Sequence, residues 1–323
     1  MQRRSILQAF AAMPAYAAWS ANAQEKYPIQ PITMVVPYAP GGNIDAMARL
    51  VSVHMGQALG QPVVIENRPG AAGVIGTDFV NRSKPNGYTL VCTANGSFVV
   101  APQMMPKRPF RPADFATVGA IGSTPLVIEG SAKGRFKTFG EMIQFAKAHP
   151  EEVTLGHPGN GTTNHIAILR LQELTGARFG IIAYKGSAPA LNDLLGGQID
   201  GLVDQLPSSL PHLKAQKLVA LALTSKEASP DLPGIKPLAD LGYPDFEVTT
   251  ITGLLAPAKT PPAIVQALNS ALGTTLANAQ VQGRLKELGT TPMPGSTQRF
   301  AEILAAEDRA AQAMFRQGLL RPE

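Results

Sequence analysis

The feature that most constrains the fold is a regular alternation of short apolar strands and amphipathic helices. Three apolar runs near the start have the composition of buried strands: 32–37, 63–65 and 88–94. The segments between them, 44–59 and 72–82, place apolar residues at the 3.6-residue spacing of a helix. A β-α-β-α-β succession predicts a parallel sheet with right-handed crossovers.

The pattern restarts after a proline-rich stretch at 102–112. Further strands are predicted at 126–128, 153–156, 179–184, 201–204 and 218–223, with helices between them, one of them opened by the capping box Thr138–Glu141. The tail from about residue 249 is one strand followed by helices at 262–277, 281–288 and 297–316, which is too helical for a third sheet, and Ser296 is predicted to cap the last helix. We therefore assign it to the first lobe.

The predicted architecture is α/β, with two lobes and a ligand cleft between them. Lobe 1 is discontinuous, 24–124 and 250–323, and lobe 2 is 125–249. The chain crosses between the lobes near Thr124 and Thr249, and two such crossing strands can act as a hinge.

Residues 1–23 read as a signal peptide. Arg3 and Arg4 precede an apolar stretch at 5–19, and Ala21-Asn22-Ala23 is a small-x-small cleavage pattern. The paired arginines resemble a twin-arginine signal, but the ordinary secretory route is favoured. We expect the mature protein, 24–323, in the periplasm.

Charge and cysteine usage exclude several classes of function. Loss of the two arginines lowers the net charge from +5 to +3, and no basic stripe is present, so a nucleic-acid partner is not expected. The single Cys92 permits neither an internal disulfide nor a thiolate metal cluster. It lies in the apolar run 88–94, which predicts a buried thiol.

Glycine-rich loops follow most of the predicted strands. In an open α/β sheet, ligands bind beyond the carboxyl ends of the strands, and free N–H groups at helix starts attract anions. One such loop alone indicates only a tight turn. Five at the same edge predict an anion-binding cleft: 38–43, 67–73, 94–97, 156–165 and 184–189.

Nucleotide and hydrolase signatures are missing from the sequence. No G-x-G-x-x-G, P-loop or G-x-S-x-G motif stands at a strand-to-helix junction, so we expect no catalytic residue and no cofactor. His157 and His165 are eight apart, not the i, i+4 pair of a helical metal site. For His165 we favour a cleft wall or a cap over catalysis.

Two charged residues at the cleft edge leave alternatives open. Lys185 could pair with a ligand carboxylate or be solvated. Asp204 could cap a turn, hold Lys185 or a ligand amino group, or set the conformation of its loop.

Long blocks of the chain resemble the Bug-type (TctC-like) periplasmic substrate-binding proteins of tripartite tricarboxylate transporters. The blocks occur in order over nearly all of the mature chain: 27–45, 60–70, 85–90, 159–165, 184–190, 193–200 and 213–225. Among them are Pro37-Tyr38-Ala39-Pro40-Gly41-Gly42 and Gly159-Asn160-Gly161-Thr162-Thr163-Asn164-His165.

The resemblance implies a type II binding-protein fold, a carboxylate held mainly by backbone amides and ordered water, and large and small membrane subunits as partners. It implies a monomeric receptor without a metal. An orphan receptor that feeds a membrane sensor is the second hypothesis and a secreted enzyme the third. Carried over residue by residue, the implied ligand contacts are Tyr38, Gly41, Gly42, Asn43, Ser97, Asn160, Gly161, Thr162, His165, Lys185, Ala188 and Asp204.

Three departures from the family pattern are expected at the cleft. Ile44 stands where a threonine is usual, Phe98 where many relatives have histidine, and His157-Pro158 where two small residues are usual. Together they predict a bulkier cleft with fewer hydroxyl groups. We therefore expect an apolar acid, including an aromatic one, rather than a citrate-like ligand.

Overall fold

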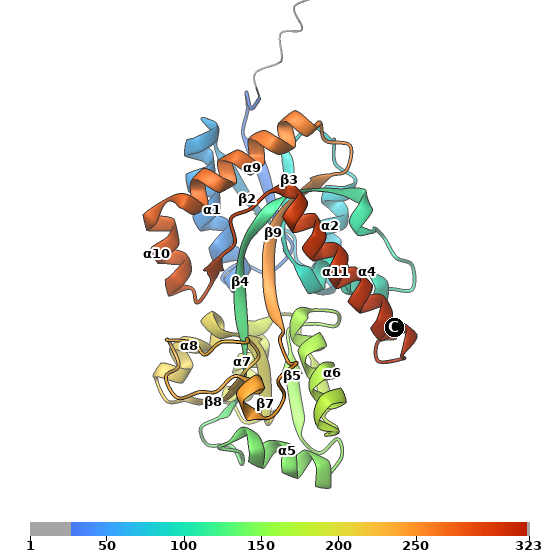
Figure 1. Cartoon of the computed structure of the whole chain (residues 1–323), viewed down its shortest axis with the longest axis vertical. Helices are drawn as coiled ribbons and strands as arrows, with labels where there is room; N and C mark the ends of the chain where they lie inside the picture. Colours follow the sequence, from blue (N-terminus) through green and yellow to red (C-terminus); the bar gives the residue numbers. More distant parts are fainter. Residues whose placement is uncertain (1–26, 322–323) are drawn as a thin grey trace, which may run out of the picture.

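The computed structural model describes residues 27–321, so the predicted signal peptide at 1–23 lies outside the described residues. Its two lobes are stacked along the long axis and joined by two long strands (Figure 1). No helix in 27–321 has both the length and the apolar character needed to cross a bilayer.

Lobe 1 is built on a parallel core. Strands β1 (Ile32–Val36), β2 (Val63–Asn67) and β3 (Thr89–Ala94) stand in the order β2-β1-β3, and β9 (Thr249–Pro257) adds to β3 antiparallel. The prediction of a parallel β-α-β-α-β unit is therefore confirmed. Its helices and short turns are α1 (Asn43–Leu59), η1 (Ala71–Gly73), α2 (Val74–Asn81), α3 (Asn95–Val99), α4 (Ala101–Met104) and η2 (Pro112–Asp114).

The tail packs against elements that precede it in the chain. Its helices are α9 (Pro262–Ala277), α10 (Ala279–Glu287) and α11 (Thr297–Arg316), and β10 (Thr291–Pro292) pairs with β4. Helices α9 and α10 contact α1, and α11 contacts α3 and β4. The Ser296 hydroxyl accepts the N–H of Arg299 and caps α11, as expected.

Lobe 2 combines parallel and antiparallel strands. Its strands are β5 (Thr154–His157), β6 (Gly180–Ala183), β7 (Gly201–Gln205) and β8 (Leu218–Leu223), and its helices are α5 (Phe139–Ala148), α6 (Thr163–Thr175), α7 (Ser187–Leu195), α8 (Leu206–Lys214) and η3 (Leu238–Leu241). Strand β5 runs parallel to β6 and β7, while β7 and β8 pair antiparallel with β4. Both bonds of the predicted capping box, Thr138 with Glu141, open α5.

Strand β4 (Phe115–Ser131) is far longer than the predicted strand 126–128. It pairs with β9 from Phe115↔Pro257 to Pro125↔Thr249, and from Leu126 onward with β7. The register shifts near Gly119 and Gly122 break the alternation that would have marked its first half. We keep the division at 124/125 and 249/250 as a proposal, supported by this change of partner.

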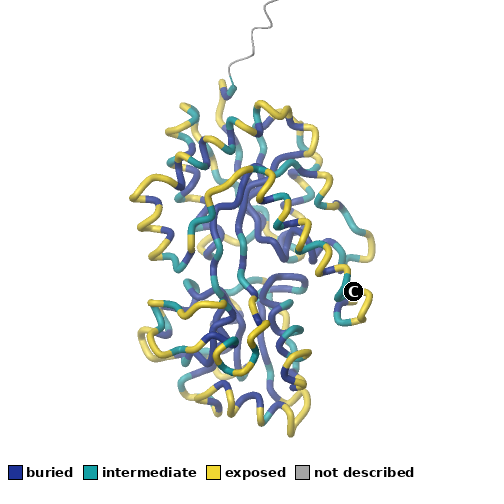
Figure 2. Tube along the Cα trace, viewed as in Figure 1, coloured by how far each residue is buried: buried dark blue, intermediate teal, exposed yellow. Residues whose placement is uncertain are grey.

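Each lobe has its own buried core on either side of its sheet (Figure 2). Cys92 belongs to the lobe 1 core and is fully buried, as predicted. Burial raises the pKa of the Cys92 thiol to about 12, so this thiol is inert at neutral pH.

Candidate functional site

The candidate site is a cavity of about 530 Å³ between the lobes. It is walled by strand ends and helix starts, the edge that the glycine-rich loops predicted. Lobe 1 contributes the loop at the start of α1, with Ala72, Ala94, Ser97 and Leu288; lobe 2 contributes residues around Thr162, the start of α7 and the start of α8.

The first loop leaves two N–H groups at the start of α1 without a partner. Gly42 is the N-cap of α1, and the N–H groups of Gly42 and Asn43 donate to no acceptor among the described residues. The N–H of Gly41 differs, because it donates to Asp45 Oδ2 at 3.0 Å. The anion cradle suggested by the sequence therefore rests on Gly42 and Asn43.

The two glycines of this loop have different requirements. Gly41 has φ +88°, a conformation that strains other residues, whereas Gly42 has φ −76°, which any residue adopts. A Cβ added to Gly42 would approach nothing nearer than the Ala39 oxygen at 4.0 Å. A side chain at Gly42 would therefore fit the fold and enter the cleft, where it would take up space needed by a ligand.

Asp45 organises this loop. Its carboxylate accepts from Arg49 at 2.9 and 3.1 Å, from Asn67 Nδ2 at 2.8 Å and from the Gly41 N–H. Burial alone would raise the pKa of Asp45, but these four donors outweigh it and hold the pKa below its ordinary value. Asp45 is therefore an ionised, fully paired structural group at neutral pH.

Tyr38 and Ser97 form the lobe 1 wall beside this loop. The Tyr38 hydroxyl shares a hydrogen bond with Thr93 Oγ1 at 3.1 Å and accepts the Ala94 N–H at 3.3 Å. Burial raises the pKa of Tyr38, so the hydroxyl keeps its proton. Both residues line the cavity, as the resemblance implied.

The lobe 2 loop at 159–165 touches lobe 1 directly. Gly161 has φ +80°, and a Cβ there would lie 2.5 Å from Ala101 Cα, so only glycine permits this approach. Thr162 caps α6 by accepting the His165 N–H, and Thr163 Oγ1 donates to Asn95 Oδ1 at 2.9 Å across the lobes. The loop therefore sets how closely the lobes meet.

His157, at the end of β5, and His165 of this loop stack on each other, and neither residue lines the cavity. Their ring centroids are 4.6 Å apart, and Gly161 donates its N–H to His165 Nδ1. Burial lowers the pKa of His157 to about 3, helped by the charge of His165, and burial lowers that of His165 to about 4. Both rings are neutral at pH 7. In 27–321 no group of three or more His, Cys, Asp or Glu is placed to hold a metal.

The start of α7 mirrors the start of α1 in lobe 2. Ser187 lines the cavity and donates through Oγ to Asp204 Oδ1 at 2.6 Å. Asp204 is fully buried at the end of β7, and burial raises its pKa to about 7. Lys185 is exposed at the rim, and within the described chain it forms no ion pair with Asp204, one of the alternatives that the sequence left open.

Most of the implied contact residues line the cavity: Tyr38, Gly41, Gly42, Asn43, Ser97, Thr162, Lys185 and Ala188. The others lie behind its wall: Asn160, Gly161, His165 and Asp204. Ser187 lies in the predicted cleft loop 184–189 and lines the cavity, although it was not among the implied contacts, and the sequence reading missed Gln205, Pro207 and Ser208, which also line it. The rule that ligands meet strand ends could have found these three, since Gln205 ends β7 and Pro207 and Ser208 lie in the first turn of α8, the next helix.

The expectation of bulky side chains on the cleft wall is correct for only some of the residues named. Ile44 and Pro158 line the cavity. Phe98 does not, because it stacks on Phe110 and meets Phe115 edge to face inside the lobe 1 core, with 1 % of its surface exposed. His157 is fully buried against His165. The expectation that Phe98 and His157 enlarge the cleft wall was wrong, because their side chains point into lobe cores.

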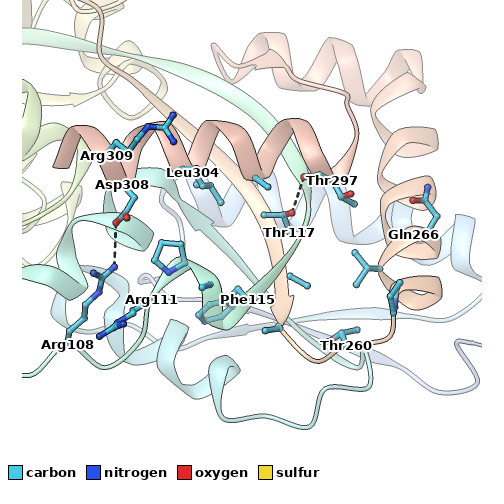
Figure 3. Close-up of a pocket in the computed structure, with 18 of the residues that line it drawn as sticks. Arg108, Arg111, Phe115, Thr117, Thr260, Gln266, Thr297, Leu304, Asp308 and Arg309 are labelled. Carbon is cyan, nitrogen blue, oxygen red and sulfur yellow. Dashed lines mark hydrogen bonds and ion pairs between the residues drawn. The ribbon is translucent and has the colours of Figure 1, made fainter. Parts of the chain in front are cut away.

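A larger hollow of about 950 Å³ lies on lobe 1 alone, along α11. Figure 3 shows Arg108 reaching across it to Asp308, at 3.5 Å, with Arg111 beside it. Asp308 also accepts from Gln103 and Gln312. Asp308 offsets the charge of Arg108, and no residue of lobe 2 lines this hollow, so the interlobe cavity is the better candidate for ligand capture.

Comparison with known proteins places the chain among bacterial binding proteins. Residues 47–318 match the model of the family described as "Tripartite tricarboxylate transporter family receptor". Protein BugT of Bordetella pertussis is 36 % identical over 285 residues, which cover 88 % of this chain and 87 % of BugT.

Solved structures match most of the chain. The periplasmic binding protein BugD superposes with a TM-score of 0.85 at 31 % identity, over 92 % of this chain and 100 % of BugD. MatC from Rhodopseudomonas palustris, with bound malate, gives 0.83 at 30 %, over 89 % and 99 %. The R. palustris protein Rpa4515, with adipate, gives 0.86 at 29 %, over 92 % and 100 %.

Proposed function

This chain belongs to the tripartite tricarboxylate transporter receptor family, and on that premise we propose that it captures a small organic carboxylate and delivers it to the large and small membrane subunits of such a transporter. It is a solute-binding receptor of the Bug type, not an enzyme. We place it in the periplasm, where the predicted signal peptide would send it and where its relative BugD is a binding protein.

The observation that carries this proposal is the pair of helix starts in one cavity. Gly42 and Asn43 at the start of α1, and Ser187 and Ala188 at the start of α7, line the same space from opposite lobes. Helix N-termini attract anions through unpaired N–H groups and the helix dipole. A carboxylate held between them favours the closed arrangement of the lobes.

We propose direct ligand contacts from eight of the implied residues: Tyr38, Gly41, Gly42, Asn43, Ser97, Thr162, Lys185 and Ala188. Ser187 and Gln205 join them, because both carry polar side chains on the cavity wall. Asn160, Gly161, His165 and Asp204 act from behind this wall by fixing the loops that carry the contacts.

The ligand that fits best has one or two carboxylates and a largely apolar body. The charged side chains on the cavity wall are Lys185 and the internally paired Asp45, while Ile44, Leu191, Pro207 and Leu288 give apolar walls. The relatives MatC and Rpa4515 have structures with malate and with adipate. We propose an acid less polar than citrate, with aromatic acids included.

A thermal-shift panel tests the ligand class. We expect benzoate, phenylacetate, adipate or malate to raise the melting temperature of the mature protein, because a ligand at 100 times its Kd stabilises by about 2.7 kcal/mol. Citrate should give a smaller shift. The bound acid should be recovered chemically unchanged, as for a receptor; turnover of the acid would contradict the assignment.

Delivery to the transporter needs a separate measurement. Membrane vesicles that contain the large and small subunits should take up the labelled acid only when the purified receptor is added. Binding without any stimulation of uptake would point instead to a receptor that serves a membrane sensor.

A further inference from the structure

A carboxyl group without a cation partner lies directly beneath the cleft. Asp204 is fully buried, its Oδ1 accepts from Ser187, and its Oδ2 is buried with no hydrogen-bond partner in the described chain. No lysine, arginine or histidine of the described residues forms an ion pair with it. A buried ionised carboxylate in this position would lack compensation for its lost hydration.

Ser187 connects this carboxyl group to the ligand space. It lines the cavity at the first position of α7, a helix of nine residues, next to Lys185 and Ala188. The helix start and the lysine both favour an anionic group at this place. Ser187 Oγ is therefore positioned to bond a ligand carboxylate.

A serine hydroxyl has a single hydrogen, and its direction depends on Asp204. When Asp204 is ionised, Ser187 donates this hydrogen to it, so only hydroxyl lone pairs remain for the ligand, and these repel a carboxylate. When Asp204 carries a proton, it donates to Ser187 Oγ, and the Ser187 hydrogen is free to bond the ligand carboxylate.

We propose that Ser187 and Asp204 form a proton-dependent recognition pair, in which capture of a carboxylate ligand is coupled to uptake of one proton by Asp204. The proton comes from solvent on binding and returns to solvent on release, and the ligand remains ionised. Asp204 is thus a positioning residue that acts through Ser187. This inference rests on the proposed function.

The surroundings of Asp204 agree with this behaviour. Glu129 on β4 is fully buried near it, with Oε1 accepting from Ser209 of α8 at 2.5 Å and Oε2 without a partner in the described chain. Burial raises the pKa of Glu129 well above its ordinary value, and the charge of Asp204 raises it further, so Glu129 is the titratable neighbour to be separated from Asp204. Burial raises the pKa of Asp204 to about 7, opposed by its bonds from Ser187 and from the Gln205 backbone. A bound anion nearby raises it further.

Calorimetry in buffers of different ionisation enthalpy measures the protons taken up. The probe is whichever of benzoate, phenylacetate, adipate and malate binds most tightly. At pH 8 we expect the wild-type protein to take up close to one proton per anion, and its Kd to rise about tenfold per pH unit between pH 8 and 9.

Two variants separate Asp204 from its acidic neighbour. In Asp204→Asn the amide donates to Ser187 as the protonated acid does, so we expect binding without proton uptake and a Kd that is flat from pH 7 to 9. Glu129→Gln is the matched control and should keep the proton uptake of the wild type.

Anion binding by the wild type without proton uptake at pH 8 would overturn the inference while leaving the receptor function intact. Proton uptake that persists in Asp204→Asn, or disappears in Glu129→Gln, would overturn it as well. Failure of all four anions to bind would overturn the proposed ligand class, and the inference with it. If Asp204→Asn fails to fold, proton uptake by the wild type and by Glu129→Gln still tests the inference.

Discussion

The starts of α1 and α7 have similar positions in the two lobes but differ in the charge state of the aspartate beside them. Each follows a strand, lines the cleft and stands close to a buried aspartate. In lobe 1, Arg49 and Asn67 surround Asp45 with donors and hold its pKa below the ordinary range. In lobe 2, Asp204 forms no ion pair in the described chain and accepts from the Ser187 side chain, and burial raises its pKa to about 7.

The difference shows that hydrogen-bond donors, and not the depth of burial alone, set the direction in which the pKa of a buried carboxyl group is shifted. Asp45 is 3 % exposed and Asp204 is 0 % exposed, yet their pKa values are shifted in opposite directions. The lobe 1 helix start is thus fixed at all neutral pH values, whereas the lobe 2 start changes with pH. Four experiments test this difference between the two helix starts.

Filling the lobe 1 helix start should give the largest effect. In Gly42→Val the side chain enters the cavity without straining the backbone, since φ is −76° and the space around it is open. We expect the Kd for the tightest panel acid to rise at least a hundredfold, about 3 kcal/mol, with the melting temperature little changed.

Gly140→Val is its control, because it adds the same side chain at an exposed helix start of lobe 2. It should bind as the wild type does. Normal affinity in Gly42→Val would refute the lobe 1 cradle.

Removing the charge of Asp45 should reduce stability. Asp45→Asn loses the charged acceptor of Arg49 and of the Gly41 N–H, so we expect a loss of about 2–3 kcal/mol in the free energy of unfolding at pH 7, measured in urea.

This loss should shrink as the pH falls below about 4, because a carboxylate of lowered pKa stabilises the fold only while it is ionised. Asp231→Asn, with its partner Lys214 at 3.9 Å on the surface, should cost less than about 0.5 kcal/mol. Equal losses in the two variants would contradict the organising role of Asp45.

The lobe 2 aspartate should respond to pH with the opposite sign. A folded pKa of about 7 against an ordinary value of about 3.9 means that the folded state loses stability as the pH rises from about 4 to 7. Asp204→Asn should therefore be about 1–2 kcal/mol more stable than the wild type at pH 8, with no gain at pH 4.

On the acid side, His157 and His165 have lowered pKa values of about 3 and 4, so the stability that they contribute is complete above pH 6.5 and declines below it. Urea unfolding from pH 4 to 8 measures both trends. A gain in Asp204→Asn that did not depend on pH would show that Asp204 is not the titrating group.

The smallest effect on carboxylate binding is expected from Lys185, at the rim of the interlobe cavity. Lys185 is exposed and unpaired in the described chain, so Lys185→Ala should weaken carboxylate binding by about 1 kcal/mol, near fivefold in Kd, and less at high salt. Lys217→Ala, exposed and remote from the cavity lining, is the control. Complete loss of binding in Lys185→Ala would mean that a side-chain ion pair, and not the backbone, carries recognition.

Features decided by neighbours in the sequence were predicted well. The Thr138–Glu141 capping box and the Ser296 cap both form, and Cys92 is buried within its strand. The glycine-rich loops after the strands meet at one cavity, because the carboxyl ends of strands share an edge.

Structural features that depend on residues distant in the sequence were not predicted. The first half of β4 escaped notice because its pairing with β9 joins residues more than 120 positions apart in the chain and passes through glycine bulges. Phe98 was placed in the cleft, but the direction of its ring depends on Phe110 and Phe115.

The α/β class, the succession of two lobes and the edge proposed for ligand binding follow from the sequence, because periodicity, caps and glycine loops are local properties. Which N–H and carboxyl groups at that edge have hydrogen-bond partners depends on the folded arrangement. It gives the Gly41 N–H to Asp45 and leaves that of Gly42 unpaired, and it brings Arg49 and Asn67 to one aspartate while leaving Asp204 with Ser187. The reason is that hydrogen-bond satisfaction and desolvation depend on every neighbour in space.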